Sequence, residues 1–286
     1  MEGDLLNSPG VIDCKGGIAV SLLVLEALKL YGYDKRPVKL ILQSDEEVES
    51  VLSDRKTLEF IKNESEGAAC FFNCEGRAAG YITTKRKGII RLFLDIKGKA
   101  AHAGDYFEGA SAIREAAYKI IDLEKKSVKD GITYNCGVIQ GGTVLNVVPD
   151  CCKVYIDVRI NNKEEFDYAM GEIEKTANNV FVEGTSCTVV PISDRKPMER
   201  TDANIKLFNH INRVSEKYGF GSQREFFSNG GSDAAYTTLA GIPTVDDIGP
   251  VGGKYHTKDE WCLIPSIAES AKLIALSIIE LDDEKI

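Results

Sequence analysis

Residues 10–50 read GVIDCKGGIAVSLLVLEALKLYGYDKRPVKLILQSDEEVES, and this stretch sets the expected fold. Its apolar residues recur at helical spacing up to Gly32, a residue that suits the end of a helix. The apolar run at 38–42 is then typical of a buried strand. Because the strand-like run AACFFNC (68–74) continues the alternation, we predict an α/β domain with a parallel sheet covered on both faces.

The middle of the chain has a different pattern, in the order strand, helix, strand, strand, helix, strand. These segments lie at 89–98, 109–126, 133–140, 152–160, 163–179 and 186–192. This order is typical of a split βαβ unit, with an antiparallel sheet and two helices. Helix and strand patterns resume afterwards, so we predict a small α+β domain at 85–196. It interrupts an α/β domain formed by 1–84 and 197–286.

Composition excludes several classes of function. The net charge of -9 and the lack of a Lys/Arg cluster argue against binding to nucleic acid or to an anionic membrane. No apolar run approaches the ~18 residues that a membrane span needs. The acidic N-terminal sequence lacks the layout of a signal peptide, and the eight cysteines include no C-x-x-C pair. We expect reduced thiols and a cytoplasmic protein.

Acidic residues follow three successive strand patterns. Asp13 precedes a glycine turn that opens a helix, Glu46 and Glu47 follow the run at 38–42, and Glu75 follows AACFFNC. The carboxyl ends of parallel strands meet at one edge of a sheet, and the glycine-rich loop with His256 can return to the same edge. Such carboxylates repel one another unless a cation neutralises them. Asp, Glu and His together suit Zn²⁺ and other divalent metals.

Simpler interpretations stay open for each motif alone. Asp13 could cap the following helix, and the residues DEE could form a solvated turn. Cys70 and Cys74 could ligate a metal, although ordinary strand packing is the preferred interpretation. If the metal site is real, one of Glu46 and Glu47 can bind the ion. The other would then act as a general base toward a water molecule.

Seven motifs occur in the order found in the M20 metallopeptidase family. They are GVIDCKGGIAVSLLVLEAL, SDEEVES, GKAAHAG, NVVPD, DVR, GGSDAAY and HTKDEW, and they span essentially the whole chain. The chain thus resembles glutamate carboxypeptidases, aminoacylases and succinyl-diaminopimelate desuccinylases. The resemblance implies a zinc-aminopeptidase-like catalytic domain with an inserted ferredoxin-like lid or dimerisation domain. It also implies a hydrolase for small peptides or N-acyl amino acids.

The resemblance also implies roles for the five residues of the expected metal site. Asp13 corresponds to the carboxylate that bridges two metals, and Glu46 to the general base. Glu47 and His256 correspond to ligands of one metal, and Glu75 to a ligand of the other. The expected cofactor is Zn²⁺, or alternatively Co²⁺ or Mn²⁺, with one or two ions per chain.

Further roles are implied for the inserted domain and for one loop. In dimeric relatives the equivalent of His102 reaches the partner's active site, so a homodimer through the lid is expected. The implied substrate-binding residues are Asn146, Arg159, Gly230, Gly231 and Ser232. From the residues alone, His102 could be an ordinary surface histidine and Arg159 could pair with a local acid. His210 is expected on a helix face without a role in the site.

Two departures from the family pattern affect the expected function. No His-x-Asp segment precedes Asp13, so the catalytic domain is expected to be incomplete at its start, with a weaker second metal site. Glu49 stands where relatives usually have glycine. We expect a metal-dependent hydrolase that cleaves an amide or peptide bond beside a free carboxylate. The alternative is a catalytically incompetent homologue that dimerises or binds a ligand.

Overall fold

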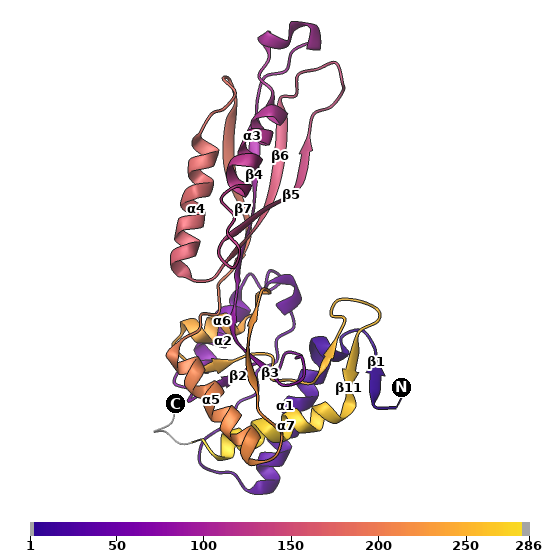
Figure 1. Ribbon diagram of the computed structural model, residues 1–286, viewed down its shortest axis with the longest axis vertical. Helices are drawn as coiled ribbons and strands as arrows, with labels where there is room; N and C mark the ends of the chain where they lie inside the picture. The colour runs from indigo at the N-terminus through magenta and orange to yellow at the C-terminus, as the bar shows by residue number, and fades with distance from the viewer. Residues whose placement is uncertain (1–2, 282–286) are drawn as a thin grey trace. The chain divides into compact units, whose positions relative to one another are not determined.

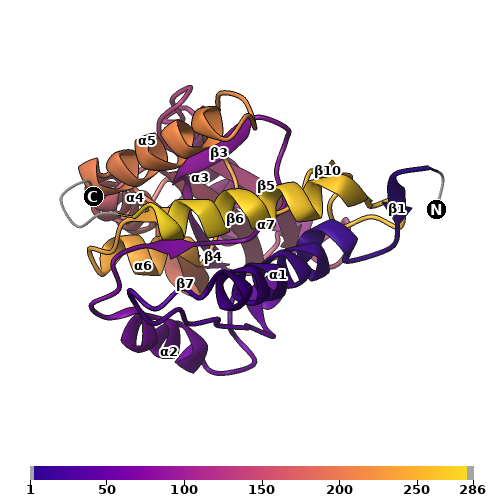
Figure 2. The same cartoon turned by 90° about the horizontal axis from the view of Figure 1, so that it is seen from below.

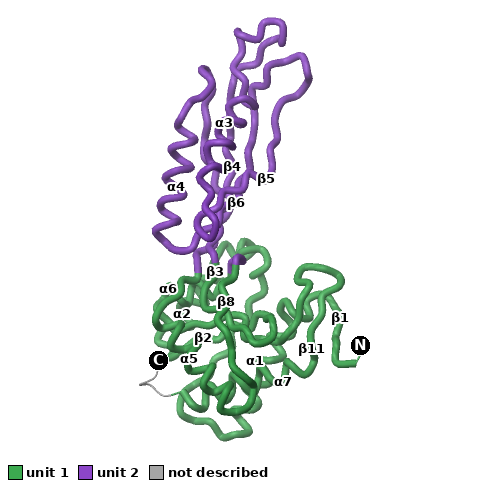
Figure 3. The backbone as a smooth tube through the Cα atoms, in the orientation of Figure 1, with its two compact units in different colours: residues 1–86, 198–228, 232–286 green, residues 87–197, 229–231 purple. Residues whose placement is uncertain are grey.

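The computed structural model describes residues 3–281, and the chain divides into two compact units. Unit 1 consists of Met1–Arg86, Met198–Ser228 and Ser232–Ile286, and unit 2 consists of Lys87–Pro197 and Asn229–Gly231 (Figure 3). Unit 2 therefore interrupts unit 1 in the sequence. Each unit has its own hydrophobic core.

Unit 2 contains an antiparallel four-stranded sheet with the strand order β5-β6-β4-β7, together with two long helices (Figure 1). The elements are β4 (Gly88–Lys97), α3 (Ala112–Glu124), β5 (Thr133–Gly141), β6 (Cys151–Ile160), α4 (Lys163–Asn178) and β7 (Ser186–Arg195). The predicted order of strands and helices is confirmed. The central strand β6 alternates strictly between buried and half-buried residues, as expected when only one face of a sheet is covered.

A buried ion pair lies within α3, and its lysine connects this helix to α4. Lys119 of α3 lies 2.8 Å from a carboxylate oxygen of Glu115, and both side chains are essentially inaccessible to solvent. The ammonium group also donates to the carbonyl oxygens of Thr176, Ala177 and Asn179 at the end of α4. A cation is favourable at a helix C-terminus, where carbonyl groups lack partners in the helix. Lys119 thus caps α4 from the neighbouring helix.

Unit 1 is built from helices and short strands. The helices are α1 (Gly16–Tyr31), α2 (Lys56–Ser65), α5 (Asp202–Lys217), α6 (Ala234–Leu239) and α7 (Ile264–Ile279). The strands are β1 (Leu5–Asn7), β2 (Phe71–Phe72), β3 (Tyr81–Arg86), β8 (Arg224–Ser228), β9 (Thr244–Val245), β10 (Gly252–Gly253) and β11 (Trp261–Leu263). β2 pairs with β9 and β3 with β8, both in parallel. β1, β11 and β10 form an antiparallel sheet.

The core of unit 1 lies where α1, α5 and α7 pack around the short parallel strands. α1 and α7 run side by side in Figure 2, and their buried residues belong to one cluster with Val245 of β9. Leu207 and Ile211 of α5 are fully buried. His210 is also buried, with Nε2 2.8 Å from the Ser277 carbonyl oxygen of α7, so it contributes to helix packing.

The predicted buried strand at residues 38–42 is wrong. The structure assigns no strand there, and Val38 and Leu42 are 38% and 60% exposed. An apolar run becomes a strand only where neighbouring strands satisfy its backbone groups, and no strand of the described residues pairs with this segment. Within residues 3–281, no helix combines the length and the apolar character that crossing a membrane requires.

Replacing Lys119 with alanine tests the buried ion pair. K119A leaves the Glu115 carboxylate buried without its cation, so we expect the free energy of unfolding of unit 2 to fall by about 3–5 kcal/mol. Urea dependence of amide hydrogen exchange in α3 and α4 measures this loss. K163A is the matched control, because Lys163 pairs with Asp167 at the same i,i+4 spacing in an exposed position. Equal losses in both variants would contradict a special role for Lys119.

Candidate metal centre

Three residues far apart in the sequence meet in unit 1. His256 Nε2 lies 2.8 Å from Asp13 Oδ2 and 3.3 Å from Glu47 Oε2. One ligand atom from each residue lies within 4.8 Å of the others, which makes them a group able to hold a metal ion. The Asp13 side chain is 12% exposed, whereas those of Glu47 and His256 are 55% and 72% exposed. The predicted ligands of one metal therefore gather at an accessible place.

Asp13 lies in a turn and not at the end of a strand, contrary to prediction. It belongs to the π-helical turn Val11–Lys15, inside which its own backbone is non-helical, with φ of -125° and ψ of 87°. Its backbone N–H donates to the Glu260 carboxylate at 2.9 Å, and Gly10 and Ile12 donate to the same carboxylate at 2.7 Å. These donors serve a side chain instead of a sheet ladder, which explains why no strand forms.

Glu46 and Glu47 lie in a single 3₁₀ turn, Glu46–Val48, and not at the end of a strand. Asp45, the first acid of this stretch, is buried, and its carboxylate accepts the N–H of Ser53 at 3.1 Å. Hydrogen bonding by the Ser53 side chain, together with this backbone N–H, lowers the pKa of Asp45. The next residue, Glu46, is half-buried, and Glu47 is exposed. The turn thus uses one carboxylate to fold and directs Glu47 toward the cluster.

The backbone conformation at position 49 explains why the family pattern predicts glycine there instead of glutamate. The backbone of Glu49 has φ of 57° and ψ of 34°, a left-handed conformation that glycine adopts without strain. Its N–H donates to the Glu46 carbonyl oxygen at 2.8 Å and closes the turn. The turn therefore favours glycine at position 49.

Glu75 lies three residues after β2 and close to the other predicted ligands. Burial raises the pKa of Glu75 well above its usual range, and the carboxylates of Asp246, Glu46 and Asp13 raise it further. The chain is packed tightly here, since a β-carbon at Gly17 would lie 2.0 Å from the Cys74 carbonyl oxygen. Glu75 is thus a buried carboxyl group among other carboxylates, and Arg86 acts on its pKa in the opposite direction.

A buried polar network next to Glu75 escaped the sequence analysis. Arg86 Nε lies 2.7 Å from Asp246 Oδ2, and the same guanidinium also pairs with Asp247. Asn73 donates to Asp246 Oδ1 at 2.9 Å and to the Ser232 hydroxyl at 3.1 Å. The adjacent acids in GIPTVDDIG were the available signal, but their partner Arg86 is 160 positions or more away.

In unit 2 the predicted catalytic residue His102 lies with Asn146, and Arg159 has other partners. His102 is exposed, and the following N–H, that of Ala103, donates to the Asn146 carbonyl oxygen at 2.9 Å. Arg159 Nε donates to Asp157 Oδ1 at 2.6 Å, and Nη2 donates to Oδ2 at 3.2 Å. Its third nitrogen, Nη1, donates to the Asn229 carbonyl oxygen at 3.3 Å. The local acid that the sequence analysis left open for Arg159 is thus present, and it takes up one side of the guanidinium.

The loop before α6 carries the other three residues that are predicted to bind substrate, Gly230, Gly231 and Ser232. The helix is only six residues long, Ala234–Leu239. Ser232 is buried, and its hydroxyl accepts hydrogen bonds from Asn73 and from the N–H of Ala234. Gly230 and Gly231 belong to unit 2 and follow Asn229, whose carbonyl oxygen accepts a hydrogen bond from Arg159. A role of these residues in binding a substrate stays a prediction.

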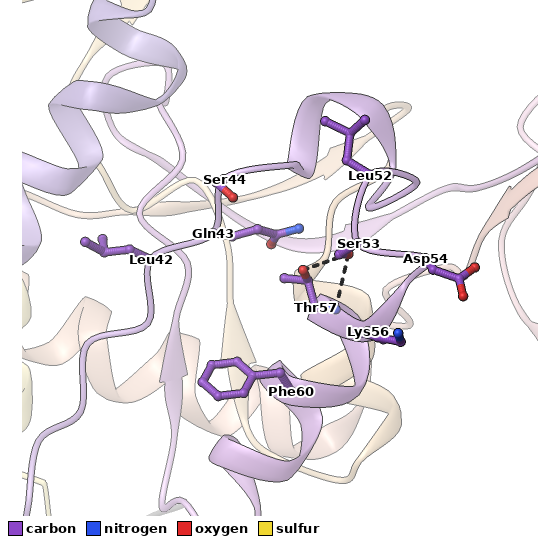
Figure 4. Close-up of a pocket in the computed structure, with 9 residues that line it drawn as sticks. All are labelled: Leu42, Gln43, Ser44, Leu52, Ser53, Asp54, Lys56, Thr57 and Phe60. Carbon is purple, nitrogen blue, oxygen red and sulfur yellow. Dashed lines mark hydrogen bonds between the residues drawn. The ribbon is translucent and has the colours of Figure 1, made fainter.

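A cavity of about 590 Å³ opens beside the acidic turn. It is lined by Leu42, Gln43, Ser44, Leu52, Ser53, Asp54, Lys56, Thr57 and Phe60 (Figure 4). The Thr57 hydroxyl donates to the Ser53 hydroxyl at 2.8 Å and closes one wall. None of these residues is a predicted ligand or catalytic group. The cavity is therefore distinct from the cluster of Asp13, Glu47 and His256.

Several known proteins are similar to this chain in sequence. Residues 84–185 match a family model described as the peptidase dimerisation domain of the M20 type. Carboxypeptidase G2 from Pseudomonas sp. (strain RS-16) is 29% identical over 98% of this chain and 68% of its own length. A succinyl-diaminopimelate desuccinylase from Xylella fastidiosa (strain M23) is 23% identical over 98% of this chain and 76% of its own. The chain is similar to M20 family peptidases over nearly its whole length.

Solved structures show the same fold. Aminopeptidase PepT from Bacillus cereus matches with a TM-score of 0.81 and 24% identity, over 97% of this chain and 74% of its own. An M20 family metallo-carboxypeptidase from Sulfolobus solfataricus matches with a TM-score of 0.74 and 16% identity, over 97% and 78%. The predicted α/β M20 fold with an inserted dimerisation domain is confirmed.

Replacing Glu49 with glycine tests the conformation of the acidic turn. E49G removes the strain of a left-handed residue, so we expect the free energy of unfolding to rise by about 0.5–1 kcal/mol. Urea denaturation measures the change. E66G is the matched control, because Glu66 is an exposed glutamate with φ of -57° and should become less stable as glycine. A loss of stability in E49G would show that the turn does not favour glycine.

Proposed function

We propose that the chain is a metal-dependent hydrolase that cleaves an amide or peptide bond beside a free carboxylate. The observation that carries the proposal is the convergence of Asp13, Glu47 and His256 from three distant segments. Similarity to M20 family peptidases supports it, since the relatives include proteins named as a carboxypeptidase and a desuccinylase. The substrates would be small peptides or N-acyl amino acids.

The cluster fits a divalent cation on chemical grounds. Two carboxylates and an imidazole are a donor set that Zn²⁺ uses in catalytic sites, and Co²⁺ or Mn²⁺ accept it as well. Asp13, Glu47 and His256 would hold one ion, and Asp13 with Glu75 would contribute to a second. Burial and then the carboxylates of Asp246, Glu46 and Asp13 raise the pKa of Glu75, and a cation bound here would offset that repulsion.

Glu46 is the proposed general base. A bound cation would lower the pKa of a water molecule and polarise the scissile carbonyl. Glu46 is adjacent in sequence to the ligand Glu47 and is one of the carboxylates that act on Glu75, so it lies at the edge of the cluster. From there its carboxylate would take a proton from the attacking water and return it to the leaving amine.

We infer that unit 2 is the lid and forms a homodimer. The match of residues 84–185 to a peptidase dimerisation domain supports this assignment. His102 would hydrogen-bond the oxyanion in the active site of the other chain. Asn146, Arg159, Gly230, Gly231 and Ser232 would contact the carboxylate of the substrate. Because Asp157 takes up one side of the Arg159 guanidinium, Nη1 beside Asn229 is the nitrogen best placed for that contact.

Replacing Glu46 with glutamine tests the base. With Zn²⁺, Co²⁺ or Mn²⁺ present, we expect E46Q to hydrolyse N-acyl amino acids and dipeptides about 10²–10⁴ times more slowly, because the proton acceptor is lost. Its affinity for the metal should stay within a few-fold of wild type. E49Q is the matched control, since it removes a charge from the same turn and should keep its rate.

Three outcomes separate the possible functions. An E46Q rate equal to that of wild type would contradict the role of Glu46. A wild-type chain that binds metal but hydrolyses none of these compounds would identify a protein that dimerises or binds a ligand without catalysis. A rate that does not depend on added metal would contradict the whole proposal.

Mixing two inactive variants tests the shared active site. In a dimer of one E46Q chain and one H102A chain, one of the two sites has both an intact Glu46 and an intact His102. Random mixing would therefore restore about a quarter of wild-type activity, because half of the dimers are mixed. Activity that stays at the level of the separate variants would show that His102 does not act across the dimer.

A further inference from the structure

Glu260 has a buried carboxylate that the proposed chemistry does not use. It lies directly before β11 and is 2% exposed. Its two oxygens accept the backbone N–H groups of Gly10, Ile12 and Asp13 at 2.7, 2.7 and 2.9 Å. Burial by itself raises the pKa of Glu260, but the N–H groups of Gly10, Asp13 and Ile12 outweigh it and lower the pKa. Glu260 is therefore a charged group whose partners are backbone amides.

One of these hydrogen bonds is donated by the backbone of Asp13, a proposed metal ligand. The N–H of Asp13 is fixed by Glu260, while the Asp13 side chain reaches His256 Nε2 at 2.8 Å. His256 precedes Glu260 by four residues in the same loop. The segment 256–260 thus carries both the His256 imidazole and the Glu260 carboxylate. This carboxylate fixes the backbone N–H of Asp13, the partner of His256. The backbone carbonyl of Glu260 adds a bond from the N–H of Ser8 at 3.1 Å.

The turn around Asp13 is closed by the N–H groups of Val11 and Lys15, which donate to the carbonyl oxygens of Ser8 and Gly10 at 3.1 and 2.9 Å, whereas the N–H of Asp13 itself donates to Glu260. Asp13 and Cys14 depart from helical geometry inside the turn Val11–Lys15, and no side chain caps the turn at its start. Three donors that a regular helix would leave without partners converge instead on Glu260. A charge-assisted hydrogen bond to a carboxylate is about twice as strong as a neutral one. Removing the carboxylate would free the backbone of Asp13 to shift.

We propose that Glu260 is a positioning residue, which holds the Asp13 carboxylate where it can share one divalent cation with Glu47 and His256. This inference rests on the metal site of the proposed function. Glu260 would not touch the ion, because its oxygens are occupied by the three backbone donors. Its effect would be on metal affinity through the geometry of Asp13. Partners behind metal ligands commonly have such an effect.

The test compares cobalt binding by metal-free full-length proteins. E260Q keeps the size of the side chain but replaces one acceptor oxygen with an NH₂ group, which cannot accept from a backbone N–H. We expect the Kd for Co²⁺, measured by calorimetry, to rise about 10- to 100-fold. The visible absorption of bound Co²⁺ should also change, because the Asp13 ligand is displaced. Neither readout depends on catalysis.

Two controls separate positioning from loss of charge and from loss of stability. D259N removes one exposed charge next to Glu260 and should keep the cobalt affinity of wild type. E115Q alters another buried glutamate that accepts backbone N–H groups, those of Phe181 and Val182 in unit 2. It should lower the melting temperature without changing cobalt binding.

The outcomes distinguish this inference from the proposed function. Equal cobalt affinity and spectra in wild type and E260Q would overturn the positioning role and leave the metal site intact. A wild-type chain that binds no Co²⁺ or Zn²⁺ would overturn both. If E260Q does not fold, E260D takes its place, because it keeps the charge but withdraws the oxygens by one methylene. A wild-type affinity in E260D would then overturn the inference.

Discussion

The backbone N–H groups of Gly10, Ile12 and Asp13 all donate to the carboxylate of Glu260. These hydrogen bonds fix the turn that carries Asp13 in unit 1. They join a turn near the start of the described chain to a loop almost 250 residues later. Strand β1 pairs with β11, which begins at the residue after Glu260. The strand pairing and the carboxylate therefore connect the same two segments of the chain. The position of Asp13 relative to His256 follows from this connection.

Unit 1 concentrates negative charge that its fold alone does not require. Asp246 and Asp247 are paired with Arg86, which gives a local structural reason for those two carboxylates. Glu75 is buried beside the carboxylates of Asp246, Glu46 and Asp13, and its burial and these charges raise its pKa, against the effect of Arg86. Groupings that cost folding energy are expected where function requires them. The divalent cation of the proposed function would offset this repulsion.

Much of unit 2 could be predicted from the sequence, because its pattern is local. Strand alternation and helical spacing are readable without knowledge of distant contacts, and all six predicted elements are present. In unit 1 the same reasoning failed for residues 38–42 and for the strand before Asp13. Strands need partners, and in both places the structure uses other contacts. Arg86 and Glu260 were missed because their partners are distant in the sequence, although Glu260 lies inside the motif HTKDEW.

Anomalous X-ray diffraction from crystals soaked with Zn²⁺, recorded on both sides of the zinc absorption edge, would examine the metal centre most directly. The structure predicts an anomalous peak at about 2.0–2.2 Å from His256 Nε2 and from one carboxylate oxygen each of Asp13 and Glu47. A peak elsewhere on the chain, with the His256 imidazole still hydrogen-bonded to the Asp13 carboxylate, would contradict the proposed metal centre.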